Sequence, residues 1–206
     1  MQARGFLLIV GLAAVYAWAL PGRTIGAAAS VLRIQNESLT VEFDTQAMSF
    51  SATSRDSGQT FVGRGLLANP DGQARRLMVN HPTWGAGQAI QIDHKSGDID
   101  RLALFPNLPF VVLDGALARE SDTVVTSIPR LAMTLDLKKA ATELRALGTG
   151  GLTGVGRQSN PGSYSFLAVA DPASRAGVVA GWVTHERGSG LLFSDVKDGD
   201  VVVDAR

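Results

Sequence analysis

The sequence lacks cysteine, and neither sign of charge is in excess. The absence of cysteine among 206 residues excludes disulfide bonds, thiolate metal sites and cysteine nucleophiles. The 19 basic and 19 acidic side chains cancel, so the chain lacks the basic excess typical of a nucleic-acid-binding domain. We therefore predict that nucleic acid is not a partner.

Hydrophobic residues make up 45% of the chain and charged residues 18%. This balance allows a packed core and is unlike that of a disordered tail. A length of 206 residues favours one domain. The 23 glycines and the shortness of the apolar runs favour an all-β class.

Residues 1–29 have the pattern of a secretory signal peptide. They contain Arg4 but no Asp or Glu, and an apolar run of about 16 residues, 5–20, ends before Pro21. The small residues Ala27–Ala29 predict cleavage at the end of this segment. An uncleaved membrane anchor is the alternative, although a spanning helix needs roughly 20 apolar residues. Cleavage predicts a secreted or periplasmic protein with no membrane partner.

From residue 30 onward the hydrophobic pattern has a period of two. Leu39, Val41 and Phe43 alternate with polar residues, which predicts a strand with one buried face. Short runs of strand type recur at 31–35, 48–53, 60–62, 89–93, 101–105, 110–113, 123–127, 131–135, 164–169, 177–184, 190–194 and 201–204. We predict that residues 30–206 form an antiparallel β-sandwich of the supersandwich-like kind. The pattern stops within a strand, so we expect the domain to be truncated at its C-terminal end.

Two segments depart from this pattern. Residues 63–88 contain many glycine, proline and asparagine residues and predict a loop with one brief strand at 77–79. Residues 138–147 are rich in helix formers, and Gly148 follows them. This composition predicts one short helix on the β scaffold.

Three patterns that resemble ligand-binding motifs fail in detail. The glycine-rich segment 148–156 has no following Gly-Lys-Ser/Thr, so it is not a phosphate loop. Segment 195–200 has lysine where a calcium loop needs a ligand, and its Asp-Gly pair predicts a hairpin turn. His81, His94 and His185 lie too far apart for zinc-ligand spacing. We predict no metal site and no cofactor.

Carboxylate pairs matter because most glycosidases need two carboxyl groups with separate roles. The nearest candidates are Asp98 with Asp100 and Glu120 with Asp122, each pair two residues apart. On a strand this spacing places both groups on one face, and we interpret that face as a solvated sheet edge. We predict no catalytic residue in this chain. A small exported enzyme with an unfamiliar site is the alternative.

Trp84 lies in the segment His81-Pro82-Thr83-Trp84-Gly85, where a flat ring on a loop can stack on a sugar. Trp84 and His81 are therefore the candidate carbohydrate contacts, and local packing is the alternative interpretation of Trp84. Trp182 lies in an alternating strand pattern and is predicted to belong to the core.

Two runs near the end of the chain carry a family resemblance. Residues 160–172 read NPGSYSFLAVADP, and residues 175–190 read RAGVVAGWVTHERGSG. They resemble the N-terminal β-sandwich of secreted bacterial alpha-galactosidase-like glycoside hydrolases. The sequence LTVEFD at 39–44 and the later SGQTF at 57–61 are similar to the first strands of such sandwiches. In that family two catalytic aspartates belong to a following (β/α)₈ barrel, against which the sandwich packs.

The resemblance implies an exported, non-catalytic β-sandwich that supports carbohydrate hydrolysis by a barrel domain missing from this sequence. No catalytic residue of the family is carried over to a position in this chain. The expected partners are a catalytic barrel or a carbohydrate. The alternative function is a free-standing secreted carbohydrate-binding or adhesion module, for which Trp84 and the polar turns are the sequence support.

Overall fold

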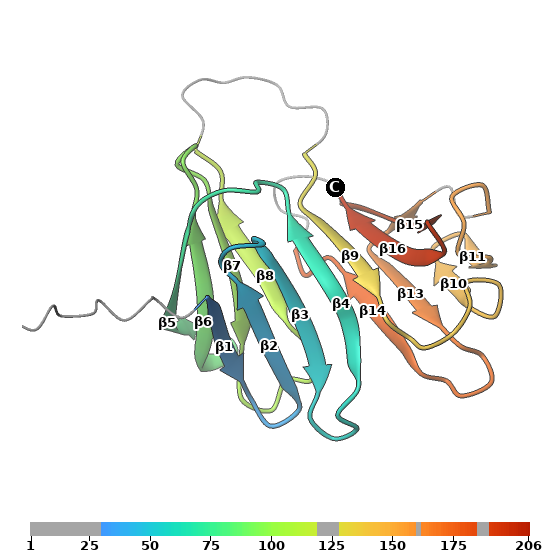
Figure 1. Cartoon of the computed structure of the whole chain (residues 1–206), viewed down its shortest axis with the longest axis horizontal. Helices are drawn as coiled ribbons and strands as arrows, with labels where there is room; N and C mark the ends of the chain where they lie inside the picture. Colours follow the sequence, from blue (N-terminus) through green and yellow to red (C-terminus); the bar gives the residue numbers. More distant parts are fainter. Residues whose placement is uncertain (1–29, 119–127, 160–161, 185–189) are drawn as a thin grey trace, which may run out of the picture.

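The computed structural model shows an all-β, sandwich-like fold built from antiparallel sheets (Figure 1). It describes residues 30–118, 128–159, 162–184 and 190–206. The predicted signal peptide at 1–29, the predicted strand at 123–127, the pair Glu120 and Asp122, and His185 lie outside the described residues. Among the residues that are described, no helix is long and apolar enough to cross a membrane.

An eight-stranded sheet forms one layer, in the order β1-β2-β3-β4-β9-β16-β15-β12. The pattern predicted for β2 is confirmed, because Val41 and Phe43 are fully buried while Glu42 between them is exposed. The bounds of these strands are β1 Val31–Gln35, β2 Leu39–Asp44, β3 Ser49–Ser54, β4 Thr60–Leu67, β9 Leu131–Leu135, β16 Asp200–Ala205, β15 Leu191–Lys197 and β12 Ser163–Tyr164.

Two four-stranded sheets form the other layer, in the orders β5-β6-β7-β8 and β11-β10-β13-β14. One cluster of buried side chains joins all three sheets, with Phe43 from β2, Ile90 from β6 and Val169 from β13. Each such side chain contributes about 1.5–3 kcal/mol on burial, so the core between the layers stabilises a chain without disulfides. The bounds are β5 Gln73–His81, β6 Gly85–Asp93, β7 Ile99–Leu104, β8 Val112–Ala116, β11 Gly151–Thr153, β10 Arg145–Gly148, β13 Phe166–Ala170 and β14 Gly177–Gly181.

The brief strand predicted at 77–79 is confirmed as part of β5. The loop predicted for the rest of 63–88 is wrong, because a long hairpin occupies most of it. β5 pairs with β6 along its whole length, from Gln73 opposite Asp93 to His81 opposite Gly85. β5 is an edge strand, and none of its residues is fully buried. An edge strand without buried positions leaves only a weak period-two pattern in the sequence.

Glycines within β4 also made this region resemble a loop. Gly65 lies against the ring of Phe50, where an added Cβ would be 2.2 Å from the ring Cζ. The close approach of an aromatic ring, and not a turn, therefore requires glycine at this position.

The predicted helix at 138–147 is also wrong. A single turn forms, in which the amide of Glu143 donates to the carbonyl of Ala140, and the chain then enters β10. Leu144 and Ala146 are buried, whereas Arg145 between them is exposed. Burial with a period of two against the core has overridden the helix propensity of these residues.

The predicted hairpin turn within 195–200 is confirmed. Lys197 pairs with Asp200 across the β15–β16 hairpin. The two residues between them have positive φ, 52° at Asp198 and 90° at Gly199. Asp-Gly suits such a turn because both residue types tolerate the left-handed backbone region.

Candidate functional site

The two predicted carbohydrate contacts meet at the tip of the β5–β6 hairpin. The rings of His81 and Trp84 stack with their centroids 4.1 Å apart and their planes 16° apart. The amide of Thr83 donates to His81 Nδ1 at 3.1 Å, which fixes the histidine ring in the turn. Both rings are half-buried, and contact with a sugar stays a prediction for each.

Trp84 also packs inward from the hairpin tip. Its ring centroid lies 5.3 Å from that of Phe105 and 6.0 Å from that of Phe110. These contacts place it over a small second cluster of buried residues that includes Ala89 and Val112. Local packing therefore uses part of the indole surface, and the rest is open to solvent. Trp182 packs against the main core, as its strand pattern predicts.

A groove of about 360 Å³ lies at the same end of the sandwich. This is the lower end in Figure 1, where the β1–β2 and β3–β4 turns lie. Because the lining comes from five separate segments of the chain, no sequence motif marks the groove. The lining residues are Gln35, Asn36, Glu37, Arg55, Met78, Ala86, Gly87, Gln88, Leu104 and Pro106.

Asn36 fixes one wall of this groove. Its Nδ2 donates to the carbonyls of Phe105 and Leu108, both at 2.8 Å. Its Oδ1 accepts from the amide of Ser38 at 3.0 Å and from that of Leu39 at 2.8 Å. The side-chain amide thus uses both of its donors and both acceptor positions. Asn36 holds the segment after β7 against the β1–β2 turn and is a positioning residue.

The carboxylates of Asp98 and Asp100 are buried, so their interpretation as a solvated sheet edge is wrong. Asp100 is 2% exposed and Asp98 is 6% exposed. Asp100 stands on the same face of β7 as Leu102 and Leu104, which belong to the main core. Asp98 and Asp100 therefore lie at the edge of the core, at the end of β7 that is remote from the groove.

Asp100 is the centre of a buried ionic network. Its Oδ2 lies 3.0 Å from His94 Nε2, and its Oδ1 accepts from Arg130 Nη2 at 2.5 Å. On the other side of the imidazole ring, His94 Nδ1 lies 2.6 Å from the carbonyl oxygen of Asp71. The network joins the β4–β5 connection, the β6–β7 hairpin and the segment that enters β9.

Asp98 extends the same contacts. Its Oδ1 accepts from the amide of Ala118 at 2.8 Å, and its Oδ2 accepts from Asn69 Nδ2 at 3.1 Å. Gly72 lets the β4–β5 connection approach closely, because a Cβ there would be 3.2 Å from His94 Nδ1. Asp100 is ion-paired and Asp98 is hydrogen-bonded within the protein, and we assign both a structural role. Among the residues that the structure describes, no cluster of three or more His, Asp or Glu side chains is placed to bind a metal ion.

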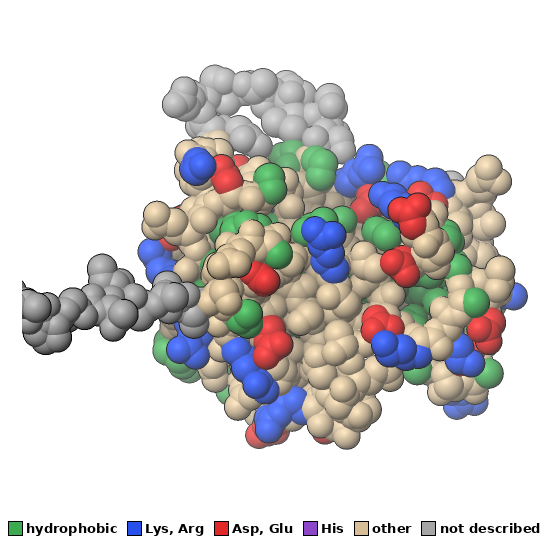
Figure 2. Space-filling view, in the orientation of Figure 1, with side chains coloured by type: hydrophobic (Ala, Val, Ile, Leu, Met, Phe, Trp, Pro, Cys, Tyr) green, Lys and Arg blue, Asp and Glu red, His purple; other side chains and the backbone are tan. Residues whose placement is uncertain are grey.

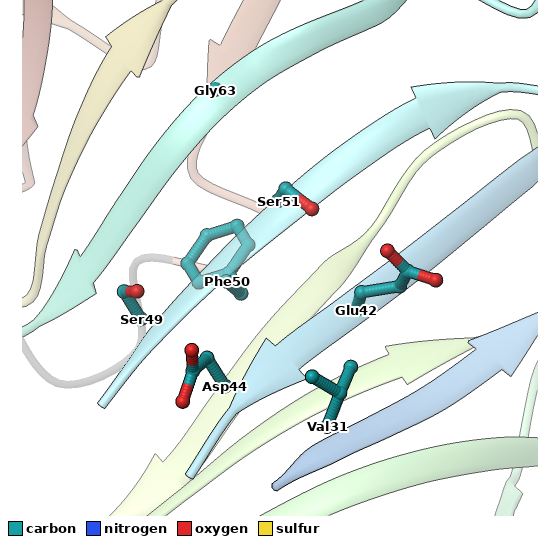
Figure 3. Close-up of a pocket in the computed structure, with 7 residues that line it drawn as sticks. All are labelled: Val31, Glu42, Asp44, Ser49, Phe50, Ser51 and Gly63. Atoms are coloured by element: carbon teal, nitrogen blue, oxygen red, sulfur yellow. The ribbon is translucent and has the colours of Figure 1, made fainter. Parts of the chain in front are cut away.

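A shallow hollow of about 220 Å³ lies on the strands β1 to β4 (Figure 3). Glu42 and Asp44 line it from alternate positions of β2. The Asp44 carboxylate accepts hydrogen bonds from the amides of Ala47 at 3.0 Å and Gln46 at 2.8 Å, and these lower its pKa. A glycosidase acid needs a raised pKa, so Asp44 has the wrong shift for that role.

The outer face of the β11-β10-β13-β14 sheet carries a row of exposed apolar residues. Leu152 pairs with Leu147, Leu147 with Ala168, and Ala168 with Val179. Leu152 is 68% exposed and Val179 is 71% exposed. Neighbouring strands lie about 4.8 Å apart, so the row is about 14 Å long. Together with Phe166, which shares the face of Ala168, these residues are called the apolar face below.

Charge of neither sign dominates the view in Figure 2, where acidic and basic side chains are interspersed. Comparisons with protein-family models, with curated proteins and with solved structures returned no match. The class of this chain is therefore given by its architecture, a sandwich-like all-β domain, and its function is inferred from its surfaces.

Proposed function

We propose that this chain is an exported, non-catalytic β-sandwich that supports carbohydrate hydrolysis by a partner barrel domain. The observation that carries the proposal is the apolar face on the β11-β10-β13-β14 sheet. Contiguous apolar surface of this kind marks sites where another protein surface packs. One side of this sheet packs on the core, since Leu167 and Val169, at alternate positions of β13, are buried. The apolar face is the opposite side of the same sheet.

The same residues link the face to the family resemblance. The runs at 160–172 and 175–190 resemble the sandwich of alpha-galactosidase-like enzymes, and they contain β13 and β14. Phe166, Ala168 and Val179 therefore belong both to the resemblance and to the apolar face. Full burial of a large apolar side chain contributes about 1.5–3 kcal/mol, and part of that gain is offset by the cost of association.

Hydrolysis by the chain alone tests the non-catalytic part of this proposal. We expect the purified product that begins at Ser30 to release no nitrophenol from a nitrophenyl α-galactoside above a buffer control. Saturable release that follows the folded protein through chromatography and is lost on its denaturation would refute the proposal.

A free-standing carbohydrate-binding or adhesion module is the second candidate function. The His81–Trp84 stack at the hairpin tip favours it, because both residues are only half-buried and leave part of an aromatic surface accessible to a sugar. In a glycan array, we expect Trp84→Ala to remove sugar binding if the stack is the contact. Binding that persists in Trp84→Ala would remove this support.

A further inference from the structure

The groove at the lower end of the sandwich in Figure 1 is lined by two charged residues, Arg55 and Glu37. Arg55 lines the groove, and no carboxylate lies within ion-pair distance of it among the described residues. Its Nη1 donates to the carbonyl of Asn36 at 2.5 Å, and this bond holds the guanidinium against the groove wall. Arg76 stands two residues before Met78 on the same face of β5, and its Nη1 donates only a long bond of 3.4 Å to the Arg33 carbonyl.

We propose that this groove binds a carbohydrate that carries a carboxylate, such as a uronic-acid residue. The site is separate from the apolar face, and it requires neither a partner barrel nor the Trp84 stack. A planar guanidinium pairs with a carboxylate through two parallel hydrogen bonds, which makes Arg55 the anchor for the charged group. Arg76 is not one of the lining residues, but it shares the face of β5 with Met78 and adds a positive charge two residues from the groove.

The remaining lining suits a ligand with one apolar and one hydroxylated side. Met78 is 69% exposed, and together with Pro106 and Ala86 it offers apolar contacts to the C–H face of a sugar ring. Gln88 also lines the groove; its Nε2 donates to the carbonyl of Gln35 at 3.2 Å, and its Oε1 can accept a hydrogen bond. Binding sites commonly combine an apolar lining with a few polar groups that set orientation.

Hydrogen bonds and close packing within the protein fix the walls of the groove. Asn36 connects the β1–β2 turn to the segment after β7 by its four hydrogen bonds. Gly87 allows Phe105 to lie against β6, since a Cβ there would be 2.6 Å from the Phe105 ring and 2.7 Å from the Leu104 carbonyl. Walls fixed in this way reduce the ordering cost of binding. Glu37 also lines the groove. Its carboxylate accepts hydrogen bonds from ligand hydroxyls and repels a ligand carboxylate, so the charged group of the ligand is expected at Arg55 and not at Glu37.

The test compares oligogalacturonate with the neutral galactose oligosaccharide of the same length. Titration is followed by backbone amide NMR shifts, which report the position of binding as well as its affinity. We expect oligogalacturonate to shift the amides of residues 35–37, 55 and 86–88, and to bind more weakly as salt rises. We expect Arg55→Ala to weaken this binding about tenfold and Arg76→Ala to weaken it less.

Arg64→Ala is the matched control, because Arg64 is exposed on β4 and lies outside the groove. If Arg55→Ala disturbs the fold, Arg55→Lys keeps the charge without the guanidinium fork and serves as the second variant. The proposal is overturned if oligogalacturonate does not bind, or if the neutral sugar binds equally well. It is also overturned if the NMR shifts are confined to the Trp84 tip, or if Arg64→Ala and Arg55→Ala lose the same amount of binding affinity.

Discussion

At the scale of single residues, the buried side chain of Asp100 has the largest predicted effect on the free energy of unfolding. Its carboxylate accepts from Arg130 and contacts His94 at a site where it is 2% exposed. Removing one member of a buried ionic group leaves the others without compensation, and this costs about 3–5 kcal/mol. We expect Asp100→Ala to lower the free energy of unfolding by about this amount in urea titrations.

Asp114 is the control for this prediction. It pairs with Arg101 at 3.4 Å on the surface, with 46% of its side chain exposed. An exposed pair contributes about 0–1 kcal/mol, so Asp114→Ala should change stability little. Similar losses in the two variants would show that the Asp100 network is not a special source of stability.

Asp171 gives a prediction for acid pH. Its carboxylate accepts from the Ser174 hydroxyl at 2.7 Å and from the Ala173 amide at 2.9 Å. These bonds, that of Ser174 first, lower its pKa. A carboxyl group with a lower pKa in the folded state stabilises the fold above its unfolded pKa of about 4. This stabilisation is lost as the pH falls through the folded pKa.

The variant Ser174→Ala should move the pKa of Asp171 back towards its ordinary value. We expect this shift in an NMR titration of the side-chain carboxyl carbon. In thermal unfolding, the variant should be less stable than the unchanged chain near neutral pH, and the difference should shrink below about pH 4. A difference that is constant across this range would contradict the assigned role of the hydrogen bond.

The buried site was not predicted, although the register of Asp100 and His94 carries a signal that the interpretation as a solvated edge overlooked. Asp100 shares its strand face with Leu102 and Leu104, and His94 follows Ile90 and Ile92 at the same two-residue spacing. That register predicts inward-facing polar groups at the end of a buried strand. The groove was not readable, because Asn36, Arg55 and Met78 are far apart in the sequence and meet only through the pairing of strands.

At the scale of elements, the pattern of buried positions determined which strands could be predicted from the sequence. β2 was predicted because one of its faces is fully buried and the other is polar. Only residues 77–79 of β5 were predicted as a strand, because this edge strand has no fully buried residue to extend the pattern. The segment before β10 resembled a helix because its composition favours one, and only contacts with the core show that Leu144 and Ala146 face inward from a strand.

The glycines of β4 provide a test of packing within one strand. A Cβ at Gly65 would be 2.2 Å from the Phe50 ring, whereas the nearest atom to a Cβ at Gly63 is 3.6 Å away. Overpacking of this kind costs about 1–3 kcal/mol, so Gly65→Ala should lower the unfolding midpoint in urea. Gly63→Ala should leave it nearly unchanged or slightly higher. Equal effects at both positions would contradict the close packing of Phe50 on β4.

At the scale of the whole molecule, two layers enclose one principal core and leave two distinct surfaces. The groove lies at one end of the sandwich, and the apolar face lies on the outer side of the smaller sheet at β10 to β14. The sandwich-like class followed from the alternating pattern. The apolar face did not, because exposed and buried apolar residues alternate along β13 and look alike in the sequence.

Association with a barrel domain tests the central claim most directly. In isothermal titration calorimetry, an alpha-galactosidase barrel without its own sandwich is titrated with the unchanged chain, with Val179→Asp and with Val196→Asp. Val196→Asp is the control, because Val196 lies on β15 in the other layer. We predict saturable binding by the unchanged chain and by Val196→Asp, and binding at least about tenfold weaker for Val179→Asp. The absence of binding by the unchanged chain, or equal binding by all three, would contradict the account.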